Sequence, residues 1–168
     1  GSGFDPVSGG EIQRAIAAGG DPRKCVFAGV GKTEAEIAYA LRKRIYCFHV
    51  ESEPELKRIN RIAGQLKKKA PVAIRVNPNV DAKTHKKITT GTYDNKFGIA
   101  FEKIPGVYTR AAKLKNINLR GLQMHIGSQL TQVAPFDAAV RKVAPLAKNL
   151  KEKHGIEFLS IGGGLGIM

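Results

Sequence analysis

Residues 46–76, YCFHVESEPELKRINRIAGQLKKKAPVAIRV, contain the unit that decides the fold. Two apolar runs, residues 46–50 and 72–76, each have the length of a buried strand. Between them, Ser52 stands where a helix N-cap is expected, and apolar side chains follow it at helical spacing. That apolar stripe comprises Leu56, Ile59, Ile62, Ala63 and Leu66. A strand, a helix and a second strand in this order indicate a βαβ unit, whose two strands are parallel.

The same alternation of strands and helices extends in both directions along the chain. Further strands are predicted at residues 4–7, 25–30, 119–126 and 158–161. Further helices are predicted at residues 11–18, 33–44, 105–114 and 135–153. Ser8 with Glu11, and Thr33 with Glu36, have the spacing of a capping box, and Pro145 is expected to break or bend the last helix.

Six predicted strands and five predicted helices in alternation define an α/β protein. The order of elements fits an open doubly wound sheet or a (β/α)8 barrel. No G-x-G-x-x-G motif follows a strand, which weakens the dinucleotide-binding form of the open sheet. Polar residues instead follow several strands, as they do at the carboxyl-end rim of a barrel, where barrel enzymes carry their sites.

The composition excludes several classes of protein. With 42% hydrophobic and 25% charged residues, the chain reads as an ordinary globular domain. We expect no membrane span and no secretory signal in the first ten residues, and hence a location in the cytoplasm or, after processing, in an organelle such as a plastid. Cys25 and Cys47 each lie in an apolar run, where buried free thiols are expected, and the Cys and His residues are too scattered for a metal site.

A formal net charge of +14 is the unusual bulk feature. It attracts anions and permits nonspecific binding of nucleic acid. The basic residues are spread over many short runs, however, and few aromatic side chains lie among them to stack on bases. A solvated basic surface is therefore favoured over a nucleic-acid interface. A non-catalytic α/β domain that binds polyanions stays open as an alternative from another functional class.

Two segments that follow predicted strands could carry chemistry. Gly162, Gly163 and Gly164 could turn backbone N–H groups toward a phosphate, or could simply form a turn or a close packing point. His125 could stack on a flat ring or transfer protons, and Ser128 could donate to a phosphate. A hydrogen-bonded core histidine is the alternative for His125.

Charged residues supply the remaining candidates. Arg75 lies inside an apolar strand, so its guanidinium needs a partner, either a structural carboxylate or a ligand. Asp5 and Glu11 could orient a cofactor, although Glu11 could also cap a helix. Lys96 could meet an anion or a second subunit, or remain solvated.

Taken together, these motifs resemble a known enzyme family. The shared stretches are Gly3–Asp5, Ser8–Glu11, Gly29–Thr33, Val50–Glu53, Arg75–Pro78, His125–Gln129 and Ile161–Gly166. They occur in this order in the fold-type III pyridoxal-phosphate-dependent decarboxylases of ornithine, arginine and diaminopimelate. The segment 79–99 is most similar to the diaminopimelate decarboxylases. The resemblance covers essentially the whole chain.

The resemblance implies a partial (β/α)8 barrel of the alanine-racemase type that binds pyridoxal 5'-phosphate. It implies that His125 stacks on the pyridine ring and that Ser128, Gly162, Gly163 and Gly164 hold the phosphate. Asp5, Glu11 and Arg75 would then line the cofactor pocket, and Lys96 would lie near the substrate and the interface of a homodimer.

The activity implied for the parent enzyme is the conversion of meso-2,6-diaminopimelate to L-lysine and CO2, the last step of lysine biosynthesis. A relative that decarboxylates another basic amino acid or carboxynorspermidine is the alternative within the family. The resemblance also places the Schiff-base lysine on a strand before Gly1 and a β-domain after Met168. We therefore expect this chain to be the central part of the barrel domain, without a catalytic residue of its own and inactive alone.

Overall fold

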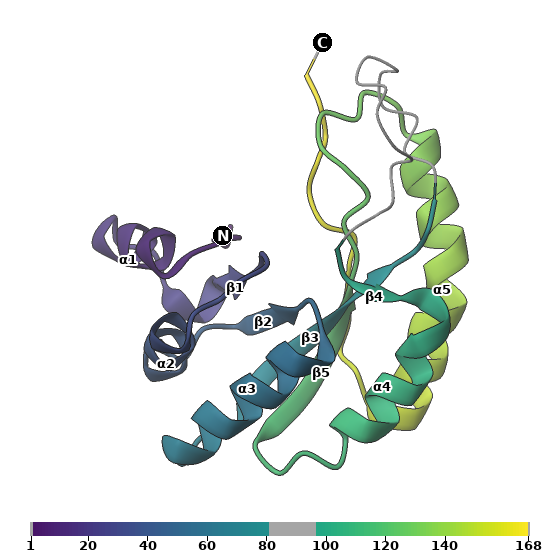
Figure 1. The fold of residues 1–168 in the computed structure, drawn as a ribbon. Helices are drawn as coiled ribbons and strands as arrows, with labels where there is room; N and C mark the ends of the chain where they lie inside the picture. The colour runs from purple at the N-terminus through teal and green to yellow at the C-terminus, as the bar shows by residue number, and fades with distance from the viewer. Residues whose placement is uncertain (1, 81–96, 168) are drawn as a thin grey trace.

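A computed structural model describes residues 2–80 and 97–167, and in it a curved parallel sheet is covered by helices along its outer side (Figure 1). The helices are α1 (Gly9–Ala17), α2 (Glu34–Lys43), α3 (Glu53–Gln65), α4 (Ile104–Ala111) and α5 (Ala134–His154), with short 3-10 turns at Pro22–Lys24 and Phe101–Lys103. The strands are β1 (Val26–Phe27), β2 (Cys47–Val50), β3 (Ala70–Asn77), β4 (Ile99–Ala100), β5 (Ile117–Gln123) and β6 (Phe158–Ser160). Among the described residues, no helix combines the length and apolar character needed to cross a membrane.

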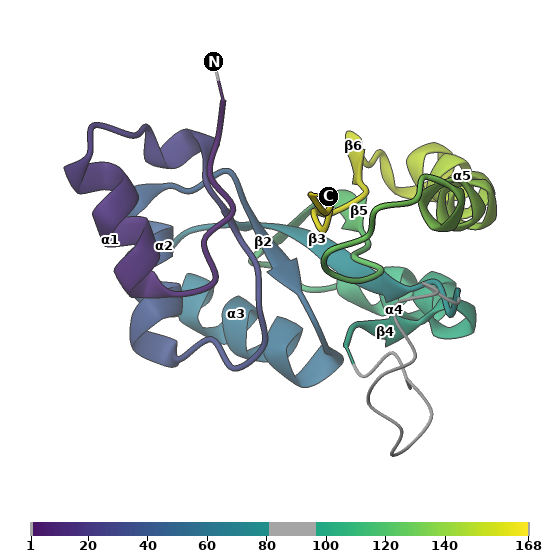
Figure 2. The same cartoon turned by 90° about the horizontal axis from the view of Figure 1, so that it is seen from above.

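The strands run in the order β1-β2-β3-β5-β6, and every pairing is parallel. The helices follow the convex side of the sheet, as the view from above shows (Figure 2). Sequential parallel order with helices outside is the arrangement of a barrel wall. The predicted α/β class and the curved partial barrel are confirmed.

Side chains alternate between the two sides of each strand. Phe48, Ile74 and Leu122 are fully buried in the core between the sheet and the helices. Their neighbours one position further, His49, Arg75 and Gln123, therefore face the concave side. Both predicted buried thiols, Cys25 and Cys47, are buried and free.

The predicted helix caps are largely confirmed. Thr33 and Glu36 form a complete capping box, and Ser52 accepts a hydrogen bond from the Glu55 N–H group at 3.3 Å. Ser8 caps α1, but the predicted capping box is only half formed. The Glu11 carboxylate accepts from the Val7 N–H group at 2.7 Å instead of from the Ser8 N–H group.

At three places the structure corrects or adds to the expected elements. Residues 4–7 do not form a regular strand. Phe4 bridges Cys25, and the Phe4 and Pro6 carbonyl oxygens accept from the Val26 and Ala28 N–H groups, but Pro6 has no N–H group with which to complete a ladder. β4, which pairs with β3, was not predicted because two residues are too short to show a pattern. α5 is not broken at Pro145, because apolar side chains on both sides of it, including Val143 and Leu150, hold the helix against the core.

Tyr108 joins α4 to the sheet and provides a test of this packing. Its side chain is fully buried, and its hydroxyl donates to the carbonyl oxygen of Gly121 in β5 at 2.6 Å. We expect Tyr108→Phe to lower the free energy of unfolding by about 1–2 kcal/mol, because the carbonyl loses its partner in a dry environment. Urea unfolding of the protein measures this loss. Tyr39→Phe, at a half-buried tyrosine of α2, is the matched control and should change stability far less.

Candidate functional site

The carboxyl ends of β2, β3 and β5 bring a buried ion pair to the concave side. Arg75 Nη1 lies 2.8 Å from Glu51 Oε1, and the side chains are 13% and 6% exposed. The second guanidinium nitrogen, Nη2, donates to the main-chain oxygen of His125 at 3.5 Å. The ring of Phe97 lies 5.7 Å from the guanidinium carbon. Arg75 therefore has the structural carboxylate that its burial demands, and it also links β3 to the segment that carries His125.

The glycine segment after β6 lies directly against the segment after β5. Leu130 N donates to the Gly164 oxygen at 2.8 Å, and Gly166 N donates to the Leu130 oxygen at 3.0 Å. Gly164 has a φ of +100°, and a Cβ there would stand 1.8 Å from the Gly127 oxygen and 3.3 Å from His125 Cε1. No other residue fits this approach without moving the backbone. The structure thus brings together His125 and the predicted phosphate cradle.

Two N–H groups of this segment are free to bind an anion. Within the part of the chain that the structure describes, the N–H groups of Gly163 and Gly164 have no protein acceptor. Ser128 is exposed in the facing segment, which the Leu130–Leu165 bridge holds beside the glycines. Unpaired main-chain N–H groups in a glycine turn, next to a hydroxyl, form an anion-binding surface. The arrangement fits a phosphate group.

The electrostatics of His125 keep its half-buried ring neutral at neutral pH. Burial lowers the pKa of His125, and the positive charge of Arg75 lowers it further. The carboxylates of Asp5 and Glu51 oppose this shift in the His125 pKa. A neutral imidazole can lie against a flat ring without bringing a second positive charge beside Arg75.

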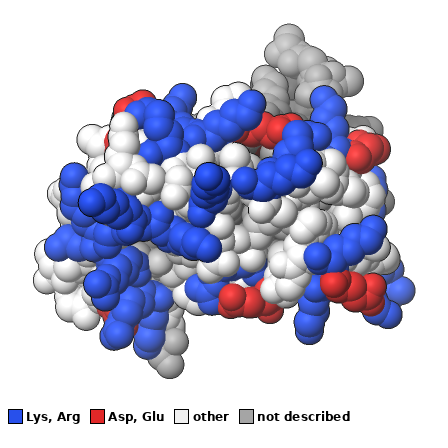
Figure 3. Space-filling model, turned by 90° about the horizontal axis from the view of Figure 1, so that it is seen from below, with Lys and Arg blue, Asp and Glu red and all other residues white. Residues whose placement is uncertain are grey.

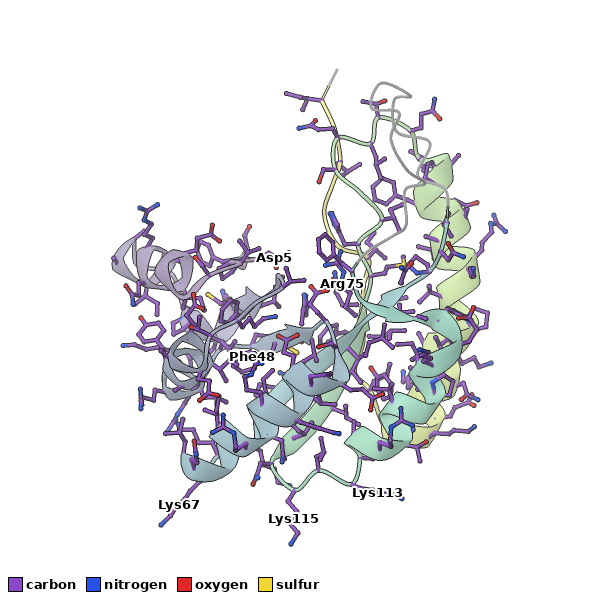
Figure 4. All side chains as sticks on the ribbon, in the orientation of Figure 1. Asp5, Phe48, Lys67, Arg75, Lys113 and Lys115 are labelled. Atoms are coloured by element: carbon purple, nitrogen blue, oxygen red, sulfur yellow. The ribbon has the colours of Figure 1, made fainter. Side chains whose placement is uncertain are left out.

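Asp5 belongs to this site, whereas Glu11 does not contact it. Partial burial raises the pKa of Asp5, although the side chain retains solvent contact. The His125 ring, when it is protonated, and the positive charge of Arg75 oppose this rise in the Asp5 pKa. Figure 4 shows Asp5 and Arg75 at the same end of the sheet. Glu11 is exposed and occupied with the Val7 N–H group, and no described contact joins it to Arg75 or His125. Lys96 lies outside the described residues.

A second buried ion pair, missed by the sequence analysis, supports Glu51. The Lys32 ammonium is fully buried and lies 2.7 Å from Glu55 Oε1. It also donates to the main-chain oxygens of Gly29 at 2.6 Å and His49 at 2.7 Å. The other oxygen of Glu55 accepts from the Glu51 N–H group at 2.7 Å. The available signals were Lys32 directly after Gly29-Val30-Gly31 and Glu55 three positions after Ser52. The second has the same spacing as an ordinary helix cap.

Polar atoms on the concave side lack partners among the described residues. These atoms are Nδ1 and Nε2 of His49, Oε2 of Glu51 and Oε1 of Gln123. His49 is 2% exposed, and burial, with the positive charges of Lys32 and Arg75, lowers the pKa of its ring to about 4. Buried polar groups without hydrogen bonds are rare and costly. The concave side is therefore suited to receive a polar group.

Comparison with known proteins gives a consistent result. Residues 1–168 match the family of pyridoxal-dependent decarboxylases, in its pyridoxal binding domain. The chain is 56% identical to a diaminopimelate decarboxylase of Vibrio cholerae and 52% identical to one of Pseudomonas aeruginosa, over 100% and 99% of its length. It covers 40% of each of these relatives.

A solved structure shares the fold over nearly the whole chain. The crystal structure of diaminopimelate decarboxylase from Helicobacter pylori complexed with L-lysine aligns with a TM-score of 0.91 at 45% identity. The alignment covers 99% of this chain and 42% of that structure. The chain thus spans about 40% of the length of the curated relatives it matches.

The Lys32–Glu55 pair can be tested by removing the charge of Lys32. We expect Lys32→Met to lower the free energy of unfolding by about 3–5 kcal/mol, because it leaves a buried carboxylate without its counter-charge. Chemical unfolding measures the effect. Arg61→Met breaks the exposed pair of Arg61 with Glu34 and is the matched control, since an exposed pair contributes little. Equal losses in the two variants would show that the buried pair has no special role.

His49 should make stability depend on pH. Its pKa is about 4 in the folded protein and 6.5 when unperturbed, so the unfolded chain binds more protons between these values. The contribution of neutral His49 to the free energy of unfolding is therefore fully present above pH 6.5. It is lost as the pH falls toward 4, by about 3 kcal/mol at most. Unfolding free energies measured across this range for the protein and for His49→Gln isolate the contribution. The idea fails if both proteins lose stability with the same slope.

Proposed function

The chain belongs to the pyridoxal-dependent decarboxylase family, and on this basis we propose that its protein is a carboxy-lyase that converts meso-2,6-diaminopimelate to L-lysine and CO2. Identities of 50–56% to several diaminopimelate decarboxylases support this substrate. Solved lysine and arginine decarboxylases, in contrast, are 22–26% identical to the chain. The observation that carries the proposal is the pair of free N–H groups at Gly163 and Gly164 beside the neutral ring of His125.

In the proposed site, this chain holds the cofactor rather than reacting with it. Ser128 and the N–H groups of Gly163 and Gly164 would bind the phosphate, with Gly162 shaping the turn. His125 would stack on the pyridine ring. Arg75, fixed by Glu51, and Asp5 would line the pocket. Glu11 would act indirectly, because its carboxylate accepts from the Val7 N–H group and so fixes the segment after Asp5.

The reaction breaks the bond between the α-carbon and one carboxylate of the substrate. CO2 leaves, and the α-carbon receives a proton in its place. Bound pyridoxal phosphate supplies the electron sink that accepts the pair of electrons released by this cleavage. The contribution of the described residues is to orient the cofactor and to keep the imidazole of His125 uncharged beside Arg75.

We further propose that residues 1–168 are the central part of a barrel domain. The lysine that binds the cofactor covalently would then come from a segment outside this chain, as would a β-domain. On this proposal the protein acts as a homodimer in the cytoplasm, with Lys96 near the subunit interface. The coverage of about 40% of each curated relative supports such an arrangement.

Two neighbouring glycines allow a matched test of the phosphate cradle. In the full-length protein, we expect Gly164→Ala to reduce pyridoxal phosphate affinity by about tenfold or more, because the added Cβ would stand 1.8 Å from the Gly127 oxygen. Gly163→Ala is the control, because a Cβ there meets nothing within 4 Å and the N–H group remains. Titration followed by the absorbance of the bound cofactor measures both.

The substrate is tested by CO2 release from the same full-length protein. We expect release with diaminopimelate and none with ornithine or arginine, and His125→Ala should lower the rate because the ring is no longer held from one side. Activity only on ornithine or arginine would reject the substrate but keep the cofactor site. Failure to bind pyridoxal phosphate would reject both.

A further inference from the structure

Lys32 differs from the many cations on the surface of this chain. Lys and Arg side chains cover much of the surface in the view from below (Figure 3), whereas the Lys32 ammonium is fully buried. A lysine is almost never fully buried unless it is paired. Its three acceptors are the main-chain oxygens of Gly29 and His49 and the carboxylate of Glu55, which belong to the loop after β1, to β2 and to α3. Lys32 therefore fixes the Glu55 carboxylate against the end of β2.

The Glu55 carboxylate does not complete an ordinary helix cap. Ser52 is the N-cap of α3, and Glu55 is the third residue of the helix. In a complete capping box the glutamate accepts from the N–H group of the cap residue itself, as Glu36 does from Thr33 at 3.0 Å. Glu55 instead accepts from the residue before the cap, Glu51, at 2.7 Å. Capping of α3 thus does not account for the position of this carboxylate.

The main chain of Glu51 depends on this contact. The pairing of β2 with β3 ends at Val50, opposite Ile74, so the sheet no longer holds the next residue. Arg75, in contrast, lies within β3, where pairing with β5 fixes its main chain. The Glu51 carboxylate meets the Arg75 guanidinium at 2.8 Å. The orientation of this guanidinium therefore depends on Glu51, and the main chain of Glu51 is held by Glu55.

We propose that Glu55 is a positioning residue for the cofactor site and that Lys32 keeps it in place. Glu55 acts through the Glu51 N–H group, and through the Glu51 carboxylate it keeps Arg75 in one orientation at the pocket. A binding site is only as precise as the side chains that support it. This inference rests on the proposed function, because Arg75 orients nothing unless pyridoxal phosphate binds beside it.

Two double variants of the full-length protein separate the contact with the Glu51 N–H group from the buried charges. Lys32→Met/Glu55→Gln removes both charges and keeps an oxygen that can accept from this N–H group. Lys32→Met/Glu55→Leu removes both charges and the acceptor, and its side chain has a similar size. Replacing both members of a buried ion pair costs far less stability than removing one of them, so both variants are expected to fold.

Three measurements report the effect of losing the acceptor. In the protein without cofactor, hydrogen exchange at the Glu51 amide should be faster in the Leu variant than in the Gln variant. Pyridoxal phosphate affinity, titrated by absorbance, should fall about tenfold or more in the Leu variant and less than about threefold in the Gln variant. The circular dichroism of the bound cofactor at saturation, which reports its orientation, should change in the Leu variant alone.

A control variant separates positioning from a general loss of stability. Leu150→Ala truncates a side chain of α5 that is 1% exposed, so it destabilises the fold without touching the Lys32–Glu55 pair. We expect it to keep both the affinity and the circular dichroism of the unmodified protein.

The outcomes distinguish this inference from the proposed function. Equal affinity and equal circular dichroism in the two double variants would overturn the role of Glu55 and leave the proposed function intact. The same change in Leu150→Ala as in the Leu double variant would assign the effect to stability and also overturn it. Failure of the unmodified protein to bind pyridoxal phosphate would reject the proposed function, and this inference with it.

Discussion

The burial of two cations at the carboxyl edge of the sheet is the constraint on which the proposed cofactor site depends. Lys32 and Arg75 each need a carboxylate, and Glu55 and Glu51 supply them at 2.7 and 2.8 Å. The two pairs are coupled, because Glu55 also binds the main chain of Glu51. Breaking a buried pair leaves an uncompensated charge, so the four side chains must assemble together. Their assembly fixes the end of β2 and, through Arg75, the position of the His125 segment.

Parallel topology explains how residues far apart in the chain reach one place. Each strand of the sheet ends at the same edge, so residues that follow β2, β3, β5 and β6 converge although more than a hundred positions separate Glu51 from Gly164. The isolated bridge between Leu130 and Leu165 extends the pairing of β5 with β6 beyond the regular strands. This bridge brings the glycine segment against His125, where only a residue without a Cβ fits at position 164.

The sequence predicted the parts of the fold that depend on local interactions. The caps at Thr33 and Ser52 and the five helices follow from patterns within a few residues of each other. The convergence of His125 with the triple glycine follows instead from the parallel order of the strands, because both segments come directly after a strand. The partners of buried charges did not follow, because an acid three positions after Ser52 has the same signature whether it caps a helix or binds Lys32. β4 depends entirely on its pairing with β3, and pairing between distant segments leaves no local pattern.

Because all the strands are parallel, the helices begin near the carboxyl ends of the strands and end near their amino ends. These two ends of the sheet therefore attract anions by different means. At the carboxyl ends of the strands the helices begin, and a phosphate there meets main-chain N–H groups, so few cations are required. Lys32 and Arg75, two of the cations that the structure describes there, are buried and paired. At the opposite edge the helices end, their carbonyl groups repel anions, and any anion must be attracted by side chains. Arg44, Lys68 and Lys69 lie at this end, and within the described part of the chain no acidic side chain pairs with them. An anion that binds at this end therefore depends on individual side chains rather than on the glycine backbone.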